Sequence, residues 1–132
     1  MSAFLKLKKR KDFVRAAKIG EKVITTSVIL QAAQSLSPNP IEAKFGFTTT
    51  KKLGKAHIRN RARRRMRAIV RELAPKEAQL NTEYVLIGRH NTAECDFNLL
   101  RRDLQYALRK INRLLNGEKD EKFSSDSPDM AD

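Results

Sequence analysis

The chain has 132 residues, and its 28 Lys and Arg against 15 Asp and Glu give a formal charge of +13 at pH 7. This length supports one domain, because a second core would leave too little apolar surface for either. The single cysteine, Cys95, excludes an internal disulfide framework or a cysteine-based zinc site and fits a reducing cytoplasm. We expect no signal peptide and no membrane segment, because the first residues are short in apolar length and no run approaches 18 apolar residues. A charge of this size favours a polyanionic partner.

The charge is unevenly distributed along the chain. The segment Gly117–Asp132 holds six acidic residues and two lysines, so 26 basic and 9 acidic residues, about +17, remain on residues 1–116. We therefore predict one folded domain over 1–116 and an acidic, disordered tail over 117–132. A body with so much like charge repels itself, so bound anions should stabilise it.

The first half of the chain alternates helix and strand signals. Lys8–Ile19 has helix-forming residues with an apolar side, and Gly20 is a plausible stop. Val23–Ala33 and Ala43–Thr50 have the alternating, β-branched or aromatic patterns of strands. Between them, Ser35–Pro40 has the composition of a turn or exposed loop.

The pattern of apolar residues in the second half of the chain predicts two longer helices. After a basic connection over Lys51–His57, apolar residues at steps of three and four predict a helix over Ile58–Leu73, which we expect Pro75 to end. Glu83–Arg89 contains an apolar run typical of a buried strand. A last helix is predicted from about Asp96 to Leu115, with Asp96 or Thr92 near its cap.

Basic residues crowd the middle of the chain, where Glu72 is the one acid between positions 44 and 72. The simplest interpretation is a solvated helix face. Arg59, Arg63, Arg67 and Arg71, however, form a stripe of like charge at steps of four, which costs roughly 0.2–0.5 kcal/mol per pair. Cations at a helix start are also disfavoured by the helix dipole, whereas phosphates would relieve both penalties. The pattern therefore favours a helix that faces RNA or DNA, and Arg suits bidentate phosphate contact and stacking on unpaired bases. The eleven basic residues are Lys44, Lys51, Lys52, Lys55, Arg59, Arg61, Arg63, Arg64, Arg65, Arg67 and Arg71.

The segment from Phe45-Gly46-Phe47 through Lys51-Lys52-Leu53-Gly54-Lys55-Ala56 to Arg59-Asn60-Arg61 and Arg67 resembles the signature of the bacterial ribonuclease P protein component. The start of the chain around Phe13, the glycine at position 20 and the strand that ends in Arg89 keep the order of that family. The resemblance covers roughly residues 5–115 and leaves the tail outside.

The resemblance implies an α+β sandwich of order α-β-β-β-α-β-α with a left-handed β-α-β crossover, against the usual right-handed expectation. It implies a subunit of ribonuclease P that binds the catalytic RNA and precursor tRNA and supports removal of the 5′ leader. Catalysis would belong to the RNA and Mg²⁺ of the holoenzyme, with no catalytic residue and no metal or other cofactor bound by the protein, and no obligate protein partner is expected.

Site residues follow from the same resemblance. One surface would face the catalytic RNA, where Gly54 would allow close backbone approach and Asn60 would organise the helix start. This set is Lys51, Lys52, Gly54, Lys55, Arg59, Asn60, Arg61, Arg63, Arg64 and Arg67.

A second surface, between the first helix and the sheet, would hold the single-stranded leader. Its candidate residues are Phe13, Lys9, Arg15, Gln31 and Arg89. Ala17 and Gln31 stand where many family members carry aromatics, so base stacking is expected to be reduced. For Phe13 a core role and a role in this cleft remain open alternatives.

Other residues support weaker hypotheses. His57 and His90 would be the acid–base pair of a protein-only nuclease, but no carboxylate pattern accompanies them. Cys95 is expected to be a packed or loop residue, and Gly46 and Gly88 are expected to reflect close packing or strand irregularity. The run from Thr48 to Thr50 suits either phosphate contact or a strand. A ribosomal or RNA-chaperoning protein is the main alternative function that the composition permits.

Overall fold

The computed structural model describes residues 5–7, 10–35 and 42–117 of the chain. The elements are β1 (Leu5–Lys6), α1 (Arg10–Ile19), β2 (Glu21–Ile24), β3 (Val28–Gln34), β4 (Lys44–Thr48), the 3₁₀ turn η1 (Lys51–Leu53), α2 (Ala56–Glu77), β5 (Thr82–Gly88) and α3 (Phe97–Leu115). None of the helices described is long and apolar enough to cross a membrane.

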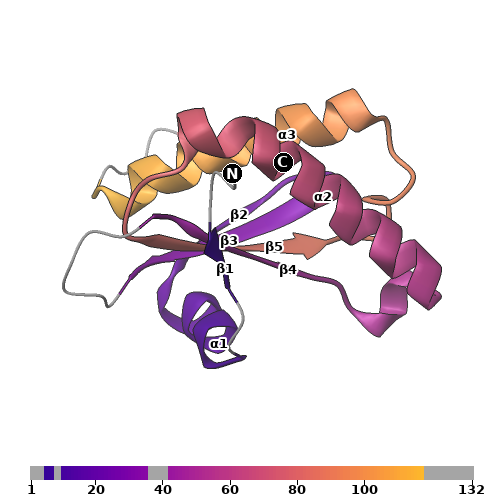
Figure 1. Cartoon of the computed structure of the whole chain (residues 1–132), viewed down its shortest axis with the longest axis horizontal. Coiled ribbons are helices and arrows are strands. Elements are labelled where there is room, and N and C mark those ends of the chain that lie inside the picture. Colours follow the sequence, from indigo (N-terminus) through magenta and orange to yellow (C-terminus); the bar gives the residue numbers. More distant parts are fainter. Residues whose placement is uncertain (1–4, 8–9, 36–41, 118–132) are drawn as a thin grey trace.

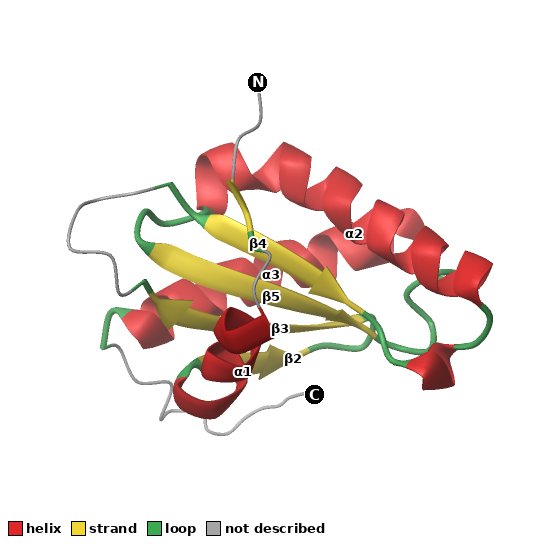
Figure 2. Cartoon of the chain, turned by 60° about the horizontal axis from the view of Figure 1, so that its bottom comes forward, coloured by secondary structure: helices red, strands yellow, loops and turns green. Residues whose placement is uncertain are grey.

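The strands form one mixed sheet between two layers of helices. Its order is β1-β4-β5-β3-β2, with β4 parallel to β5 and β3 antiparallel to β5. Helix α1 covers one face, and α2 and α3 lie side by side on the other (Figure 1). In Figure 2, β4 and β5 run the same way with α2 behind them, so the β4–α2–β5 connection is left-handed. The expected α+β sandwich and its unusual crossover are confirmed.

The main hydrophobic core lies between the sheet and the helices α2 and α3. Alternate strand residues, among them Leu30, Phe45, Tyr84 and Leu86, point into it and are fully buried. The rings of Phe45 and Tyr84 stack with their centroids 4.6 Å apart. On the other face of the sheet, the buried residues described form a small cluster under α1. Part of that face is therefore not covered by core packing.

The segment predicted as one strand, Val23–Ala33, is a hairpin of β2 and β3, so that prediction is wrong in detail. The turn forms because the Thr25 hydroxyl accepts a hydrogen bond from the Val28 amide at 3.1 Å, while the Thr25 amide donates to the Val28 carbonyl at 3.0 Å. Threonine favours strands and also makes such local bonds, so the alternating pattern continues through the turn.

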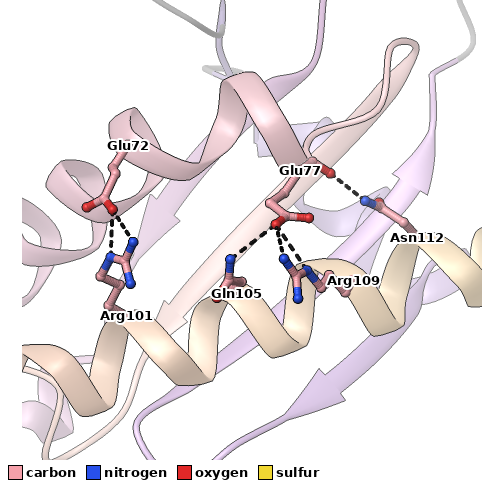
Figure 3. Close-up of polar contacts among 6 residues, drawn as sticks. All are labelled: Glu72, Glu77, Arg101, Gln105, Arg109 and Asn112. Carbon is pink, nitrogen blue, oxygen red and sulfur yellow. Dashed lines mark hydrogen bonds and ion pairs between the residues drawn. The ribbon is translucent and has the colours of Figure 1, made fainter.

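Pro75 does not end its helix, contrary to the prediction. It lies in the last turn of α2, and the helix continues to Glu77. That turn is held against α3, because Glu77 accepts hydrogen bonds from Gln105 and Arg109 at 3.2 and 3.0 Å, and its carbonyl accepts one from Asn112 at 2.6 Å (Figure 3). Tertiary contacts thus offset the backbone bond that proline cannot make.

The contacts of Glu77 predict a dependence of stability on pH. Hydrogen bonding from Arg109 lowers the pKa of Glu77 below its ordinary value of 4.5. When folding lowers the pKa of a carboxyl group, its ionised form stabilises the folded state at any pH above the unfolded-state pKa. This stabilisation is lost as the pH falls through the folded-state pKa. The free energy of unfolding of Glu77→Gln should therefore fall less than that of the wild type between about pH 5 and pH 3, as urea denaturation would measure.

The control is Glu94→Gln, because Glu94 is exposed and lies outside the ion pairs of the described residues. If the free energy of unfolding falls equally with pH in the wild type and in Glu77→Gln, the prediction is contradicted.

Several local predictions have clear outcomes. The Asp96 side chain caps α3 by accepting from the Asn98 amide at 2.8 Å, whereas the Thr92 hydroxyl donates to the Ser27 carbonyl at 2.6 Å. Gly20 follows the end of α1, as expected. The two-residue strand β1 was not predicted. The start of the helix at Lys8, most of the loop over Ser35–Pro40 and most of the predicted tail lie outside the described residues.

Candidate nucleic-acid interface

The predicted RNA-facing segment begins directly after β4. Lys51 and Lys52 lie exposed on η1, which turns the chain toward α2. Gly54 closes this turn with φ +127°, a conformation that favours glycine, and its amide donates to the Lys51 carbonyl at 3.2 Å. Backbone conformation therefore gives a reason for glycine here that does not depend on a close approach by RNA. Lys55 is the N-cap residue of α2 and is also exposed.

Two arginines tie the start of α2 to the loop between β5 and α3. The Arg61 Nε donates to the Ala93 carbonyl at 2.8 Å, and Arg65 donates to the Thr92 and Cys95 carbonyls at 2.8 and 2.5 Å. The Arg65 guanidinium also lies 5.5 Å from the centre of the Phe97 ring. Arg65 thus fixes the position of the helix, although the signature did not single it out as a site residue. Arg61 binds the loop through Nε alone, so its two terminal nitrogens remain for other partners.

Three more arginines are oriented by neutral groups. Arg59 donates to the Gly54 carbonyl at 3.2 Å, and Arg63 donates to the Thr49 hydroxyl at 3.0 Å and to the Asn60 amide oxygen. The Arg67 guanidinium lies 5.4 Å from the centre of the Phe47 ring. Asn60 therefore orients Arg63 and does not cap the helix, which has no side-chain cap. None of these contacts neutralises charge.

The positive charge of this segment is unpaired within the described residues. The three ion pairs found there join Arg15 to Glu83, Arg101 to Glu72 and Arg109 to Glu77. Glu72 and Glu77 thus belong to pairs that join the end of α2 to α3 (Figure 3). Arg64 and Arg71 are exposed and have no acidic partner in the same residues. We call the surface formed by Lys51, Lys52, Lys55 and the arginines from Arg59 to Arg67 the arginine surface.

A second feature is an open hollow of about 380 Å³ between α1 and the sheet. Three strands supply its floor and α1 supplies one wall, as the view from the α1 side helps to follow (Figure 2). The Phe13 ring fits over β4 because residue 46 is glycine, where a Cβ atom would lie 2.4 Å from Phe13 Cζ. The lining residues are Arg10, Phe13, Gln31, Thr48, Val85 and Ile87.

The predicted cleft residues divide into two groups. Phe13 and Gln31 line the hollow, and Phe13 also packs on the small cluster under α1, so both of its proposed roles are compatible. Arg15 instead donates to Glu83 at 3.2 Å and to the Gln34 carbonyl, and Arg89 donates to the Thr25 carbonyl at 3.0 Å. Lys9 lies outside the described residues. Arg10, Thr48, Val85 and Ile87 were missed, because finding them requires the register of three strands.

The ion pair of Arg15 involves a buried carboxylate. Burial and the nearby charge of Asp12 raise the pKa of Glu83, while Arg15 acts in the opposite direction. The pair joins α1 to β5 and leaves Arg15 with little freedom to contact a ligand.

The remaining candidates have structural explanations. Cys95 is partly buried, and burial raises the pKa of its thiol, which disfavours a nucleophilic thiolate. His57 and His90 are both exposed, and neither side chain forms a hydrogen bond or ion pair within the described residues. Gly88 reflects close packing, because a Cβ atom there would lie 2.9 Å from Thr49 Cγ2. Thr48 lines the hollow and Thr49 holds Arg63, so these threonines do more than favour a strand.

The hollow and the arginine surface meet at one end of the sheet. Thr48, at the end of β4, lines the hollow, and the chain passes from there through Thr49 to the lysines of η1. An unpaired cationic helix beside an apolar, aromatic-walled hollow suits phosphates and unpaired bases. Fold and site thus define an RNA-binding protein of the α+β sandwich class.

Comparison with known proteins identifies the family within this class. The Ribonuclease P family model matches residues 1–112, and the chain belongs to the ribonuclease P protein family. The ribonuclease P protein component of Paramagnetospirillum magneticum is 39% identical over 129 residues, covering 96% of this chain and 92% of that protein. That of Gluconacetobacter diazotrophicus is 43% identical over 105 residues, covering 80% and 89%.

Solved structures agree with this assignment. The RNase P protein from Thermotoga maritima, in complex with 1-(4-fluorophenyl)-2-thiourea, matches with a TM-score of 0.68 and 25% identity, covering 80% of this chain and 98% of that chain. The RNase P protein of Staphylococcus aureus matches in fold with a TM-score of 0.67 and 23% identity, covering 84% and 97%. The chain is thus the protein component of an endoribonuclease that acts in tRNA processing, and its partner is RNA.

Proposed function

We propose that the arginine surface binds the catalytic RNA of ribonuclease P and that the hollow binds the single-stranded 5′ leader of precursor tRNA. The observation that carries this proposal is the division of α2. Its acids form ion pairs with α3 at one end, while its arginines have only neutral partners at the other. A helix that needed charge only for solubility would mix the two signs.

The arginine surface suits a folded RNA. Its cations lie on a helix start and an adjoining turn, so they can follow a phosphate backbone over several residues. Arg61 and Arg63 each bind the protein through part of the guanidinium, which leaves other N–H groups for bidentate phosphate contact. Lys51, Lys52, Lys55 and Arg64 are exposed and add charge without fixed geometry.

The hollow suits unpaired nucleotides. Phe13 offers a ring face, Val85 and Ile87 offer an apolar floor, and Arg10 lies exposed at the rim. Because the hollow adjoins η1, one molecule would hold the leader and the catalytic RNA side by side. The protein would then position the RNA substrate relative to the RNA catalyst.

In this proposal the chemistry of cleavage stays with the RNA subunit, and Mg²⁺ is held by RNA. Neither surface contains a carboxylate, which is the side chain through which proteins usually bind Mg²⁺. In the part of the chain described, no group of three or more His, Cys, Asp or Glu residues could hold a metal ion. We further propose that the complex works in the cytoplasm.

Reconstitution tests the assignment. Precursor tRNA is incubated at low Mg²⁺ with the protein alone, with the cognate catalytic RNA alone, and with both. We expect cleavage to be accelerated only when both are present. Cleavage by the protein alone would contradict RNA catalysis and revive the histidine hypothesis, and an unchanged RNA rate would favour a general RNA-binding role.

The leader site is tested by Phe13→Leu, which keeps an apolar side chain but removes the ring. The measured quantity is the dissociation constant for a substrate with a one-nucleotide leader divided by that for a substrate with a full-length leader. Stacking contributes ~1–3 kcal/mol per base, so we expect this ratio to fall roughly 5-fold to 150-fold in the variant holoenzyme. Val14→Ala, on the same helix but outside the hollow, is the control. A ratio that Phe13→Leu leaves unchanged would place the leader elsewhere.

A further inference from the structure

Helix α1 is held to the sheet by a largely buried ion pair as well as by apolar packing. The Arg15 guanidinium lies 3.2 Å from the Glu83 carboxylate of β5, and it also donates to the Gln34 carbonyl of β3. The side chains of Arg15 and Glu83 are 19% and 8% exposed. A single side chain of α1 thus binds two neighbouring strands of the sheet.

Stability alone does not explain these two charges. Removing both charges from water costs much of what their attraction returns, and an apolar pair of similar volume is often equally stable or more stable. Apolar packing is already present beside the pair, where Ala16 of α1 meets Val85 of β5. Charges that stand where apolar side chains would serve indicate a role in fixing geometry.

The ion pair lies next to the hollow on both of the elements that it joins. Side chains alternate along a strand, so Glu83 shares one face of β5 with Val85 and Ile87, which belong to the floor of the hollow. On α1, Arg15 follows Phe13 by two residues, and Phe13 belongs to the wall. The spacing between wall and floor is therefore set close to the ion pair.

Hydrogen bonds define this spacing more narrowly than the apolar contacts do. Apolar attraction is non-directional, and the cluster under α1 is small. Hydrogen bonds restrict both the distance and the angle between their partners. Because Arg15 binds Glu83 on one strand and the Gln34 carbonyl on the next, it fixes α1 along the sheet as well as above it. A displacement of about 1 Å can reduce a rate ~100-fold where function depends on position.

We propose that Arg15 and Glu83 are positioning residues for the substrate leader, because their ion pair holds the Phe13 wall at the distance from the sheet that the leader requires. The inference rests on the proposed function, in which the leader occupies the hollow. Both residues act through α1 and lie outside the set that lines the hollow. Loss of the pair should therefore weaken leader binding without removing a group that contacts the leader.

The test replaces the ion pair with apolar side chains of similar size in the double variant Arg15→Met/Glu83→Leu. The net charge of the protein stays the same, because one cation and one anion are removed together. The measured quantity is the ratio of dissociation constants used for Phe13→Leu, in the reconstituted holoenzyme. We expect this ratio to fall roughly 5-fold or more, which corresponds to the loss of at least one stacking contact.

The matched control removes a different ion pair. Arg101→Met/Glu72→Leu eliminates the pair between α2 and α3, on the face of the sheet opposite α1 (Figures 1 and 3). This double variant also keeps the net charge, and it should retain the wild-type ratio. An equal fall in both double variants would show that the effect is not specific to α1 and would overturn the proposal.

Two measurements on the free protein separate a local displacement of α1 from unfolding. The Tm of Arg15→Met/Glu83→Leu should equal or exceed that of the wild type, because an apolar pair replaces charges removed from water. Amide hydrogens of α1 should exchange with solvent faster than in the wild type, while those of α2 and α3 keep their rates. A lower Tm would show that the charges are retained for stability and would overturn the proposal.

The outcomes also separate this inference from the function on which it rests. An Arg15→Met/Glu83→Leu holoenzyme that keeps the wild-type ratio overturns the positioning role. If Phe13→Leu lowers the ratio in that case, leader binding in the hollow stands. If Phe13→Leu has no effect on the ratio, the proposed leader site fails, and the role of the ion pair fails with it.

Discussion

Replacing Lys51, Lys52 and Arg64 with glutamine is expected to weaken binding to the catalytic RNA roughly 100-fold at physiological salt, since each phosphate contact contributes on the order of 1 kcal/mol there. All three side chains are exposed, and none forms a hydrogen bond or ion pair within the described residues. The loss should therefore report RNA contacts and leave the fold intact. Filter binding over a salt series measures it, and the slope of log K against log salt should decrease by about 2–3 units.

A matched control removes the same charge elsewhere. Lys18, Lys76 and Arg102 are also exposed, and they lie outside the arginine surface. Their triple glutamine variant has the same net charge as the first, so it corrects for long-range attraction. An equal loss of affinity in both variants would mean that RNA responds to total charge, and would refute the arginine surface as a site.

The second large effect is on stability. Gly20→Ala should lower the free energy of unfolding by about 3 kcal/mol or more, because the added atom meets backbone that cannot yield. A Cβ atom at this position would lie 2.2 Å from the Ala32 carbonyl oxygen and 2.6 Å from the Ala16 carbonyl oxygen. Helix α1 would have to move away from β3. Thermal or urea unfolding of the purified protein measures the loss.

Gly46→Ala is the matched control for this prediction. Its Cβ atom would lie close to the far end of the Phe13 ring, at 2.4 and 2.7 Å from two ring carbons. A side chain beside an open hollow can rotate away, so the loss of stability should be clearly smaller than for Gly20→Ala. Equal losses would indicate that α1 is held to the sheet less firmly than the structure implies.

The sequence was sufficient to predict the two long helices, α2 and α3, and the strand β5. The apolar residues of α2 and α3 recur at steps of three and four, which suit a helix, and the apolar run of β5 has the length and composition of a buried strand. The hairpin of β2 and β3 was missed because Thr25 favours a strand while its hydroxyl also makes the bonds of the turn. Pro75 was misjudged because the contacts that hold the last turn of α2 come from α3, which lies far away in the sequence.

Prediction of the site was limited in a similar way. The signature residues from Lys51 to Arg67 indicated the arginine surface, because unpaired like charge is visible in a sequence. Nothing local distinguishes Arg65, which holds a loop, from Arg64, which is exposed, because the carbonyls that Arg65 binds belong to residues 92 and 95. In the same way, Arg15 and Arg89 looked like ligand contacts, but they bind Glu83 and Thr25 across the fold.

The neutral partners of the arginines have a consequence for the speed and strength of RNA capture. Arg59, Arg63 and Arg67 already occupy defined positions against a carbonyl, a hydroxyl and a ring before any ligand arrives. A free arginine loses as much as ~2 kcal/mol of rotamer entropy when it is immobilised, and these side chains have lost much of theirs on folding. RNA that reaches this helix therefore meets a rigid template, and association should need little rearrangement of the protein.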